Sequence, residues 1–293
     1  MTMKCALSLA VLFPYSGMFA QEAGLIHGLF RRRYQEGERL VYRMKASNNG
    51  QHYEAQATGV VKKDSSGAFI EEYEWSNITA NGVQVDVSPA SAQFRQRLSL
   101  EPGKAPAIPN LTGVHRILIG PITDFLTFYA DLWLAARVDK LRRAGDRVFY
   151  PHGTPASWAG GNHVVIGEDS IDFDITLAQV DADRKVAKLL IRHVPPKNPQ
   201  VKLPAVWMRE AVADTPNNWV NVIRNGDKRV AAVGKETFDV QITVSLLKGE
   251  IVSGTIENSV TARERDCQDA ALTNCGDTRP RQILRHIKIS LVR

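Results

Sequence analysis

Residues 121–143 have the sequence PITDFLTFYADLWLAARVDKLRR, a segment unusually rich in large apolar side chains. These side chains recur at helical spacing along one side of the segment: Ile122, Phe125, Leu126, Tyr129, Leu132, Trp133, Ala136 and Leu141. Pro121 stands near the first helical position, where its missing N–H is not needed, and Gly145 could supply the left-handed residue that ends a helix. The segment therefore predicts one long, largely buried helix over residues 121–143.

The charges of this segment fit a core helix better than a membrane span. Asp124, Asp131 and Arg137 interrupt the apolar run, which a transmembrane helix rarely tolerates. An acidic residue lies near the expected start and basic residues gather at the expected end, so both complement the helix dipole. We expect this helix to pack against strands that lie on either side of it in the sequence.

Alternating apolar and polar residues predict strands before and after the helix. In residues 38–46 (ERLVYRMKA), for example, Leu40 and Tyr42 fall on one face of an extended chain. Asn81-Gly82 is a tight-hairpin signal between two further strand patterns. About five or six strands in meander order precede the helix, and the same alternation returns between residues 163 and 293. The chain is expected to be mainly β, in the α+β class, with antiparallel strands.

Residues 34–42 (YQEGERLVY) have the form Y-x-x-G-E-x-L-x-Y and open the first predicted strand. Together with the order of meander, apolar helix and further strands, this segment resembles uncharacterised exported β proteins related to the periplasmic lipoprotein-localisation factors. The resemblance implies a curved antiparallel sheet, or half-barrel, wrapped around one long amphipathic helix. It implies no particular functional residue, because lipid handling in that group depends on the shape and apolarity of the concave face.

Four prolines interrupt residues 195–208, PPKNPQVKLPAVWM. Proline cannot donate a hydrogen bond to a sheet, so this segment cannot be a central strand. We predict a Pro-rich loop over residues 195–209, of the kind that often serves a function or a partner contact. Trp207 and Met208 are its candidate contact residues.

The first twenty residues have the layout of a cleaved export signal. Lys4 precedes an apolar run over residues 5–13, and small residues lead to Ala20. The run is too short to span a bilayer. We predict cleavage near Ala20 and a periplasmic or secreted protein.

Behind the signal peptide (1–20) we expect an N-terminal arm over residues 21–37 and a single antiparallel β domain over residues 38–293. The arm contains apolar residues followed by three consecutive arginines, at positions 31–33. It could pack on the domain as a short helix or arm, or it could touch a membrane surface. The packed arm is the favoured interpretation.

Only Cys267 and Cys275 would remain after cleavage of the signal. Two cysteines this close in an exported protein predict a disulfide. A redox-active pair is the alternative, but no C-x-x-C motif is present.

The formal net charge is +6, and +5 without the signal, whose one charged residue is Lys4. Basic residues are scattered along alternating strands, so they indicate a solvated surface. A nucleic-acid partner is not expected. With 44% hydrophobic and 23% charged residues, the composition is that of an ordinary globular protein.

Common linear motifs of catalysis are absent: the sequence has no G-x-S-x-G, H-E-x-x-H, P-loop or Rossmann glycine pattern. The most suggestive region is residues 150–169, where His152 and His163 could ligate a metal with Glu168 or Asp169 as third ligand. Their spacing matches no standard metal motif, and ordinary loop histidines near a hairpin explain them as well. Neither a metal nor another cofactor is expected.

Two further candidates lie in or beside this region. Ser157 could act as a nucleophile, although no base can be identified for it. Asp169, Asp172 and Asp174 could bind calcium, but alternation places the last two on the solvent face of a strand, and the glycine of a calcium loop is missing. No catalytic residue is assigned, and an enzymatic role, although open, is not the favoured one.

The aromatic side chains of the helix and of the strands before it could line a ligand pocket or could be plain core. The candidate pocket residues are Tyr42, Tyr73, Trp75, Phe125, Tyr129 and Trp133. The leading hypothesis is a non-catalytic exported protein that binds a lipid or another hydrophobic ligand between helix and sheet. One alternative is an envelope structural or protein-interaction module that binds a partner through residues 197–209 or through exposed strand edges. The other is a hydrolase with a site around His152, His163 and Asp169.

Overall fold

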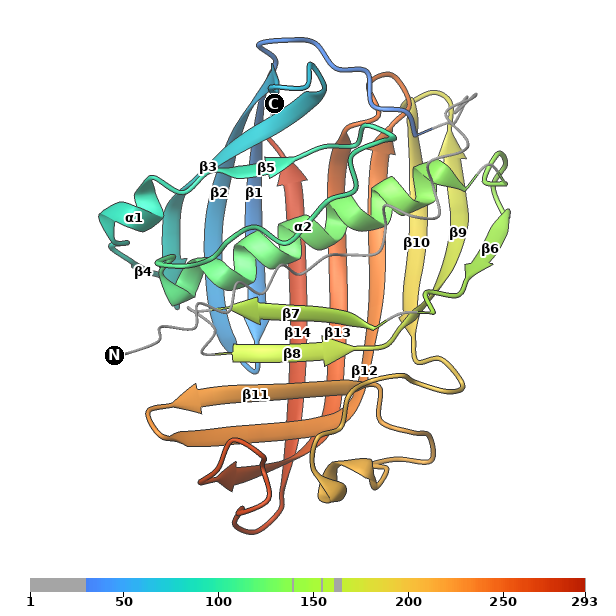
Figure 1. Ribbon diagram of the computed structural model, residues 1–293. Helices are drawn as coiled ribbons and strands as arrows, with labels where there is room; N and C mark the ends of the chain where they lie inside the picture. The colour runs from blue at the N-terminus through green and yellow to red at the C-terminus, as the bar shows by residue number, and fades with distance from the viewer. Residues whose placement is uncertain (1–29, 139, 154, 161–164, 293) are drawn as a thin grey trace.

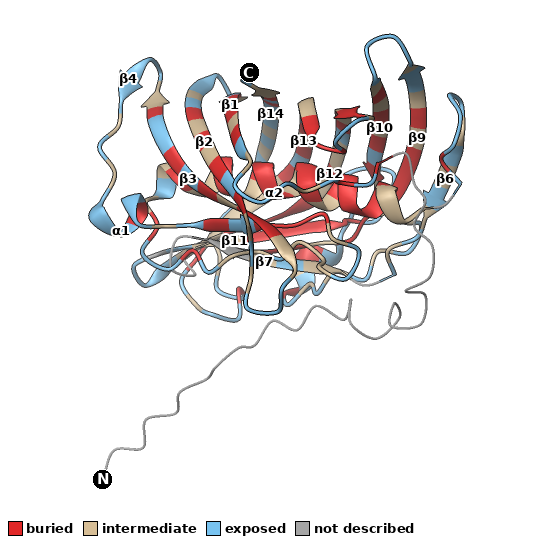
Figure 2. Ribbon diagram, turned by 90° about the horizontal axis from the view of Figure 1, so that it is seen from above, coloured by how far each residue is buried: buried red, intermediate tan, exposed pale blue. Residues whose placement is uncertain are grey.

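The computed structural model describes residues 30–138, 140–153, 155–160 and 165–292. In this part of the chain one long helix, α2 (Arg116–Arg137), lies in the hollow of a large antiparallel sheet that is not closed into a barrel (Figure 1). Seen from above, the sheet curves around the helix (Figure 2). The predicted mainly β fold, a curved sheet wrapped around one helix, is confirmed. The predicted signal peptide, the first part of the predicted arm and His163 lie outside the described residues.

The main sheet has the strand order β4-β3-β2-β1-β14-β13-β12-β10-β9-β6, and neighbouring strands are antiparallel. The strands are β1 (Arg39–Asn48), β2 (Gln51–Lys63), β3 (Phe69–Ala80), β4 (Val83–Gln84), β6 (Arg147–Tyr150), β9 (Asp172–Asp181), β10 (Val186–Val194), β12 (Lys228–Ser245), β13 (Ile251–Cys267) and β14 (Arg279–Leu291). Because β14 pairs with β1, strands from the two ends of the described chain meet in the middle of the sheet.

Shorter elements lie off this path. β5 (Gln96–Leu98) pairs with β3, and the short helix α1 (Pro89–Ala92) precedes it. β11 (Trp219–Asn225), β8 (Val165–Asp169) and β7 (Ala156–Gly160) form a branch that starts on β12. In Figure 1, β7 and β8 lie below α2 and cross the direction of the long strands.

The buried side chain of Asn218 fills the gap at which the sheet branches. Along one edge of β12, β11 pairs as far as Gly234 and β10 pairs from Phe238 onward, so neither strand reaches Glu236. Asn218 Oδ1 accepts the backbone N–H of Glu236 at 2.8 Å, and Asn218 Nδ2 donates to the Glu236 carbonyl at 3.2 Å. Buried backbone groups need such partners. The asparagine therefore allows the sheet to divide without leaving these groups unpaired.

α2 packs on the concave face of the sheet through fully buried side chains, among them Leu118, Ile122, Phe125, Phe128 and Leu132. The approach is closest where the Phe128 ring lies against Gly254 of β13, because a Cβ at Gly254 would come within 2.5 Å of that ring. By length and composition α2 could cross a membrane, but 67% of its apolar 18-residue window is buried inside the protein. The helix therefore has the position expected of a core helix.

The helix begins before its predicted start at residue 121. Leu118 is fully buried and continues the apolar stripe one turn ahead of Ile122, so the helical pattern extends back to Arg116. Pro121 lies inside the helix instead of opening it. The prediction was wrong at this end because Gly120-Pro121 resembles a start signal.

The helix also ends before its predicted end at residue 143. Val138 adopts an extended backbone and closes the helix after Arg137. The side chain of Asp146 then accepts the backbone N–H groups of residues 142 and 143, each at 2.7 Å. Local bonds of this kind compete with helical ones. Gly145 does have a positive φ, but in this turn and not at the helix end.

The predicted Pro-rich loop over residues 195–209 packs on the domain and ends in the 3-10 helix η2 (Val206–Arg209). Met208 is fully buried in a small apolar cluster, with Ala205, Val220, Ala231, Val233, Cys267 and Leu272. Trp207 Nε1 donates to the carbonyl of Leu272 at 3.0 Å. Only Val206, at 78% exposure, stands out from this segment as a large exposed apolar side chain. The predicted disulfide between Cys267 and Cys275 is present beside the cluster and is consistent with an oxidising compartment.

The described part of the N-terminal arm is held by a buried ion pair. The Nε of Arg32 donates to Glu71 at 2.8 Å and its Nη2 to Glu38 at 2.7 Å, and the side chains of Arg32 and Glu71 are each 1% exposed. The hydroxyls of Tyr73 and Tyr129 donate to the same Glu71 carboxylate, which connects the arm to β3 and α2. Burial lowers the pKa of Arg32, but the two carboxylates outweigh this effect and raise it above its usual value.

Replacement of the buried arginine should destabilise the fold strongly. The substitution Arg32→Met leaves the Glu71 carboxylate buried without its cation, so the free energy of unfolding should fall by about 3–5 kcal/mol. Urea denaturation followed by tryptophan fluorescence measures this loss.

The exposed neighbour gives the matched control, since Arg31→Met should change the free energy of unfolding by less than about 0.5 kcal/mol. Addition of Glu71→Gln to Arg32→Met removes the unpaired charge and should restore part of the loss. Equal stability of the two single arginine variants would contradict the role given to Arg32.

Candidate functional site

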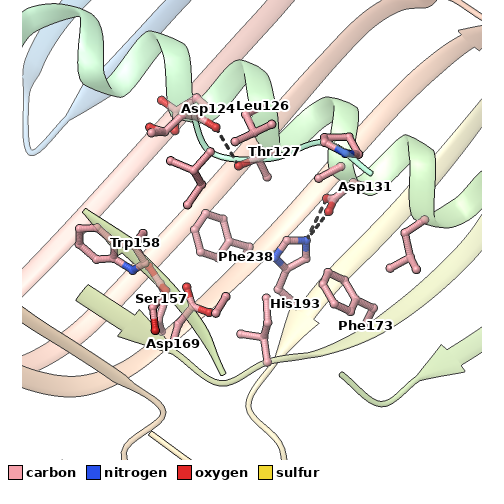
Figure 3. A pocket seen from close by; sticks show the side chains of 18 of the residues that line it. Asp124, Leu126, Thr127, Asp131, Ser157, Trp158, Asp169, Phe173, His193 and Phe238 are labelled. Atoms are coloured by element: carbon pink, nitrogen blue, oxygen red, sulfur yellow. Dashed lines mark hydrogen bonds and ion pairs between the residues drawn. The ribbon is translucent and has the colours of Figure 1, made fainter. Parts of the chain in front are cut away.

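A cavity of about 380 Å³ lies between α2, the β7–β8 hairpin and the concave face of the sheet (Figure 3). Its wall is mostly apolar and includes Ile119, Leu126, Trp133, Leu134, Trp158, Val165, Ile171, Phe173 and Phe238. The polar side chains that reach it are Thr123, Asp124, Thr127, Asp131, Ser157, Asp169, His193, Glu236 and Arg285. An apolar cavity with a few convergent polar groups is the usual form of a small-molecule site.

Small side chains on one face of α2 leave room for this cavity. Thr123, Thr127 and Ala130 follow one another at intervals of about one helical turn and all line it. On the opposite wall, the indole of Trp158 in β7 lies against Gly167 in β8, where a Cβ would come within 2.0 Å of the ring. Glycine at this position therefore allows the hairpin to hold the tryptophan as part of the wall.

Two buried carboxylates of α2, Asp124 and Asp131, reach the cavity from the same side of the helix. Figure 3 shows Asp131 facing His193, whose Nε2 lies 2.9 and 3.0 Å from the two carboxylate oxygens. A carboxylate only accepts hydrogen bonds, so Nε2 carries the proton in this pair. Asp124 forms an ion pair with Arg285 of β14 and accepts the hydroxyl of Tyr53 at 2.6 Å. Both helix carboxylates are therefore matched by a partner on the sheet.

A line of polar side chains continues from Arg285 across the floor of the sheet. Arg285 Nη1 donates to Asn258 Oδ1 at 3.4 Å, and Asn258 Nδ2 donates to Glu236 Oε1 at 3.1 Å. The three residues come from the successive strands β14, β13 and β12. Asn258 and Glu236 are buried. The three side chains therefore form a hydrogen-bonded chain from Arg285, the partner of Asp124 on the helix, to Glu236.

Asp169 and Glu236 are the carboxyl groups of the cavity that form no ion pair with a cation among the described residues. Asp169 Oδ1 is buried without a hydrogen-bond partner. Burial, reinforced by Glu168 and opposed by His193, raises the pKa of Asp169 to about 7. Burial and the charge of Asp169 raise the pKa of Glu236 to about 8, although the hydrogen bond from Asn258 and the charge of Arg285 act in the opposite direction. Near neutral pH, the two groups therefore hold at least one proton between them.

Ser157, considered above as a nucleophile, lines the cavity with its hydroxyl bonded to a carboxylate. Ser157 Oγ donates to Glu168 Oε2 at 3.2 Å, and Glu168 Oε1 accepts the backbone N–H of Lys202 at 2.7 Å. This carboxylate connects the hairpin to the Pro-rich segment. Its two bonds explain the burial of Glu168 without a catalytic role.

The metal and calcium alternatives find no support in the described residues, where no group of three or more His, Cys, Asp or Glu side chains could hold a metal ion. His152 packs edge-on against Phe173 with ring centroids 5.7 Å apart, and burial lowers its pKa. Asp174 lies on the strand face opposite the buried Phe173 and Ile175 and beside the exposed Phe149, as alternation predicts, but its side chain is buried instead of solvated. It accepts two bonds from Arg147, at 2.6 and 2.5 Å, which replace contact with water.

Of the predicted pocket residues, Trp133 lines this cavity. The others, Tyr42, Tyr73, Trp75, Phe125 and Tyr129, are buried together as an aromatic cluster between α2 and strands β1 and β3. Their neighbouring rings have centroids 5.0 to 6.3 Å apart, which is the spacing of packed aromatic pairs. The structure thus places these residues in the core, whereas the cavity lies along other α2 side chains from Ile119 to Leu134.

Sequence reasoning missed His193, Glu236 and Arg285, although the sequence contains a signal for each. Side chains two positions apart on a strand share a face. Each of the three stands in the same phase as buried apolar residues of its strand: Leu189 and Ile191, Val240 and Ile242, and Ile287 and Ile289. A charged or titratable residue on the strand face that otherwise carries buried apolar side chains indicates a buried polar site.

Comparison of the chain with protein-family models, with curated proteins and with solved structures found no match. The function of the cavity is therefore inferred from its own geometry.

Neutralisation of both unmatched carboxyls, by Asp169→Asn with Glu236→Gln, should change how stability depends on pH. A group whose pKa is raised by folding favours the folded state below its unfolded pKa, near 4, and this contribution is lost as pH rises through the folded values of about 7 and about 8. Between about pH 5 and about pH 9 the wild type should lose at least ~1.4 kcal/mol more stability than the double variant, which corresponds to one pKa unit. Urea denaturation at both pH values measures the difference.

A matched control carries Asp183→Asn and Glu54→Gln, since both side chains are exposed. It should keep the pH dependence of the wild type. The lowered pKa of His152 acts in the opposite direction but is common to all three proteins. Identical pH dependence in the wild type and the cavity variant would contradict the burial of two protonated carboxyls.

Proposed function

We propose that this protein is an exported binding protein that holds a small hydrophobic or amphipathic ligand in the cavity between α2 and the sheet. The observation that carries this proposal is the cavity itself, about 380 Å³ in volume, with aromatic and aliphatic walls. The cavity is partly open to the surface, so a small molecule could enter it. A concave, mostly apolar space of this size with a few polar groups is the usual form of a small-molecule site.

The volume favours a small ligand. It lies near the lower end of the range typical of small-molecule sites, about 300–1,000 Å³. It therefore suits a compact molecule or a single hydrocarbon chain better than a whole two-chain lipid. Ring faces of Trp133, Trp158, Phe173 and Phe238 would provide most of the apolar contact.

The disulfide and the layout of the N-terminal sequence support export to the periplasm or beyond. Relation to the lipoprotein-localisation factors stays a prediction that rests on residues 34–42 and on the order of elements. The curved sheet around one helix agrees with that relation in outline.

Ligand binding can be tested with N-phenyl-1-naphthylamine, a neutral fluorophore whose emission rises in apolar surroundings. The wild type should bind it in saturable fashion. Ala130→Phe adds a ring to the wall of the cavity and should weaken binding at least about tenfold, because the space for the fluorophore is occupied. Native mass spectrometry after mild purification should in addition detect a co-purified small molecule.

Ala182→Phe adds the same ring on an exposed turn and should leave binding within about twofold of the wild type. Circular dichroism and thermal unfolding of both variants separate loss of binding from loss of folding. No saturable binding by folded wild type, or equal binding by both variants, would reject the cavity as the site.

The buried Asp131–His193 pair favours a second candidate function, hydrolysis of a small ester or glycoside in the same cavity. A histidine oriented by a carboxylate is a common general base, and groups with pKa values near 7 are suited to proton transfer. A panel of chromogenic esters and glycosides between about pH 6 and about pH 9 tests this function. Any turnover should fall at least about hundredfold in His193→Gln, and an inactive wild type would reject the candidate.

A further inference from the structure

The acidic side chains that line the cavity outnumber the basic ones. On the negative side, α2, β8 and β12 contribute Asp124, Asp131, Asp169 and Glu236. On the positive side, the described lining residues include one arginine, Arg285, and no lysine. Arg285 is paired with Asp124. His193 is bonded to Asp131. Asp169 and Glu236 remain, on two different strands, and neither forms an ion pair among the described residues, although the charge of Arg285 acts on Glu236 from the next-but-one strand.

We propose that the ligand of this cavity is a cationic amphiphile, an apolar molecule with a protonated amine, whose positive charge is bound by the carboxyl groups of Asp169 and Glu236. The inference rests on the proposed function, because it concerns the ligand of the same site. It adds the chemical class of that ligand and the two residues that recognise it.

These two groups are informative because Glu236 is buried and because the Oδ1 atom of the half-buried Asp169 is buried as well. Buried carboxyls are normally paired or fully hydrogen-bonded. Asp169 Oδ1 is buried without a partner although its side chain reaches the cavity, and Glu236 receives its side-chain hydrogen bond from the neutral amide of Asn258. An ammonium group offers three N–H donors together with a positive charge that favours the ionised form of both carboxyls. It would satisfy both residues at once.

Other ligand classes fit the polar end less well. A carboxylate or phosphate ligand would add negative charge beside two carboxyls whose pKa values are already raised by burial and by neighbouring carboxylates. A neutral apolar ligand would fill the space but leave the buried Asp169 oxygen without a partner. The apolar wall and the carboxyl pair are therefore best matched by one molecule with a hydrocarbon body and a cationic end.

Cation binding at this pair should be linked to pH. A primary alkylamine stays protonated across the neutral range, with a pKa near that of lysine, about 10.4. Deprotonation of Asp169 and Glu236 should therefore strengthen its binding, with loss of protons from the protein. The titratable and charged groups that act on the pair or line the same cavity are Glu168 on β8, His193 on β10, Arg285 on β14, and Asp124 and Asp131 on α2.

Isothermal titration with octylamine, 1-octanol and octanoate tests the proposal, because the three share one hydrocarbon chain and differ in charge. At about pH 8, octylamine should bind at least about tenfold more tightly than 1-octanol, and octanoate should bind most weakly. The Kd of octylamine should fall about tenfold from about pH 6 to about pH 8, while that of 1-octanol stays constant. Titrations in buffers of different ionisation enthalpy should detect about one proton released with octylamine.

The variant Asp169→Asn with Glu236→Gln separates recognition of the cation from binding of the chain. It should lose the preference for octylamine and its pH dependence, and it should keep 1-octanol binding within about threefold. The exposed control, Asp183→Asn with Glu54→Gln, should keep the full preference.

Three other outcomes distinguish failure of this inference from failure of the proposed function. Equal binding of octylamine and 1-octanol by the wild type overturns this inference and leaves the proposed function standing. Persistence of the amine preference in the cavity variant overturns the assignment to Asp169 and Glu236. Absence of binding of 1-octanol, octylamine and the neutral fluorophore removes the proposed function and the inference with it.

Discussion

Burial of α2 in the hollow of the sheet is the constraint on which the rest of the structure depends. The helix is apolar enough to require cover on most of its surface, and a flat sheet could cover only one side of it. Curvature of the sheet, the close approach at Gly254 and the docking of the Arg32 arm all follow from that requirement. Because Asp124 and Asp131 are buried with the helix, the sheet must also present Arg285 and His193 opposite them. These two pairs fix the position of the helix along the sheet, which apolar contact alone would leave free to slide.

The same constraint explains why core and cavity lie side by side along one helix. On one face of α2, large rings such as Phe125 pack against Tyr42 and Tyr73. The face with Thr123, Thr127 and Ala130 has side chains too small to reach the opposite wall. Branching of the sheet at β12 supplies that wall, since β11, β8 and β7 fold under the helix there. Asn218 and Glu236 lie at the branch point, so the feature that divides the sheet also brings a carboxyl group to the cavity.

Much of the architecture was predictable because it depends on local pattern. Alternation over residues such as Leu40 and Tyr42 places strands, and the stripe through Trp133 places the helix to within about one to two turns. Errors arose where side chains compete with those patterns, as when Asp146 accepts backbone N–H groups and helps to end the helix. The aromatic residues offered as a pocket were real core residues, but aromaticity alone does not distinguish a filled interior from a hollow one. That distinction depends on the sizes of facing side chains from distant segments.

The sequence by itself determined the mainly β class, the core helix and the cysteine pair, because periodicity and short spacing are properties of neighbouring residues. It also contained a signal that was not used: His193, Glu236 and Arg285 lie on strand faces whose other side chains are buried and apolar. Only the tertiary structure decided which of these charges meet. Asp131 lies 62 positions from His193, and Asp124 lies 161 positions from Arg285. No local pattern specifies such a pairing. Burial in a low-dielectric interior requires a partner for each of the two helix carboxylates, Asp124 and Asp131. Asp169 and Glu236 are then left without an ion pair among the described residues.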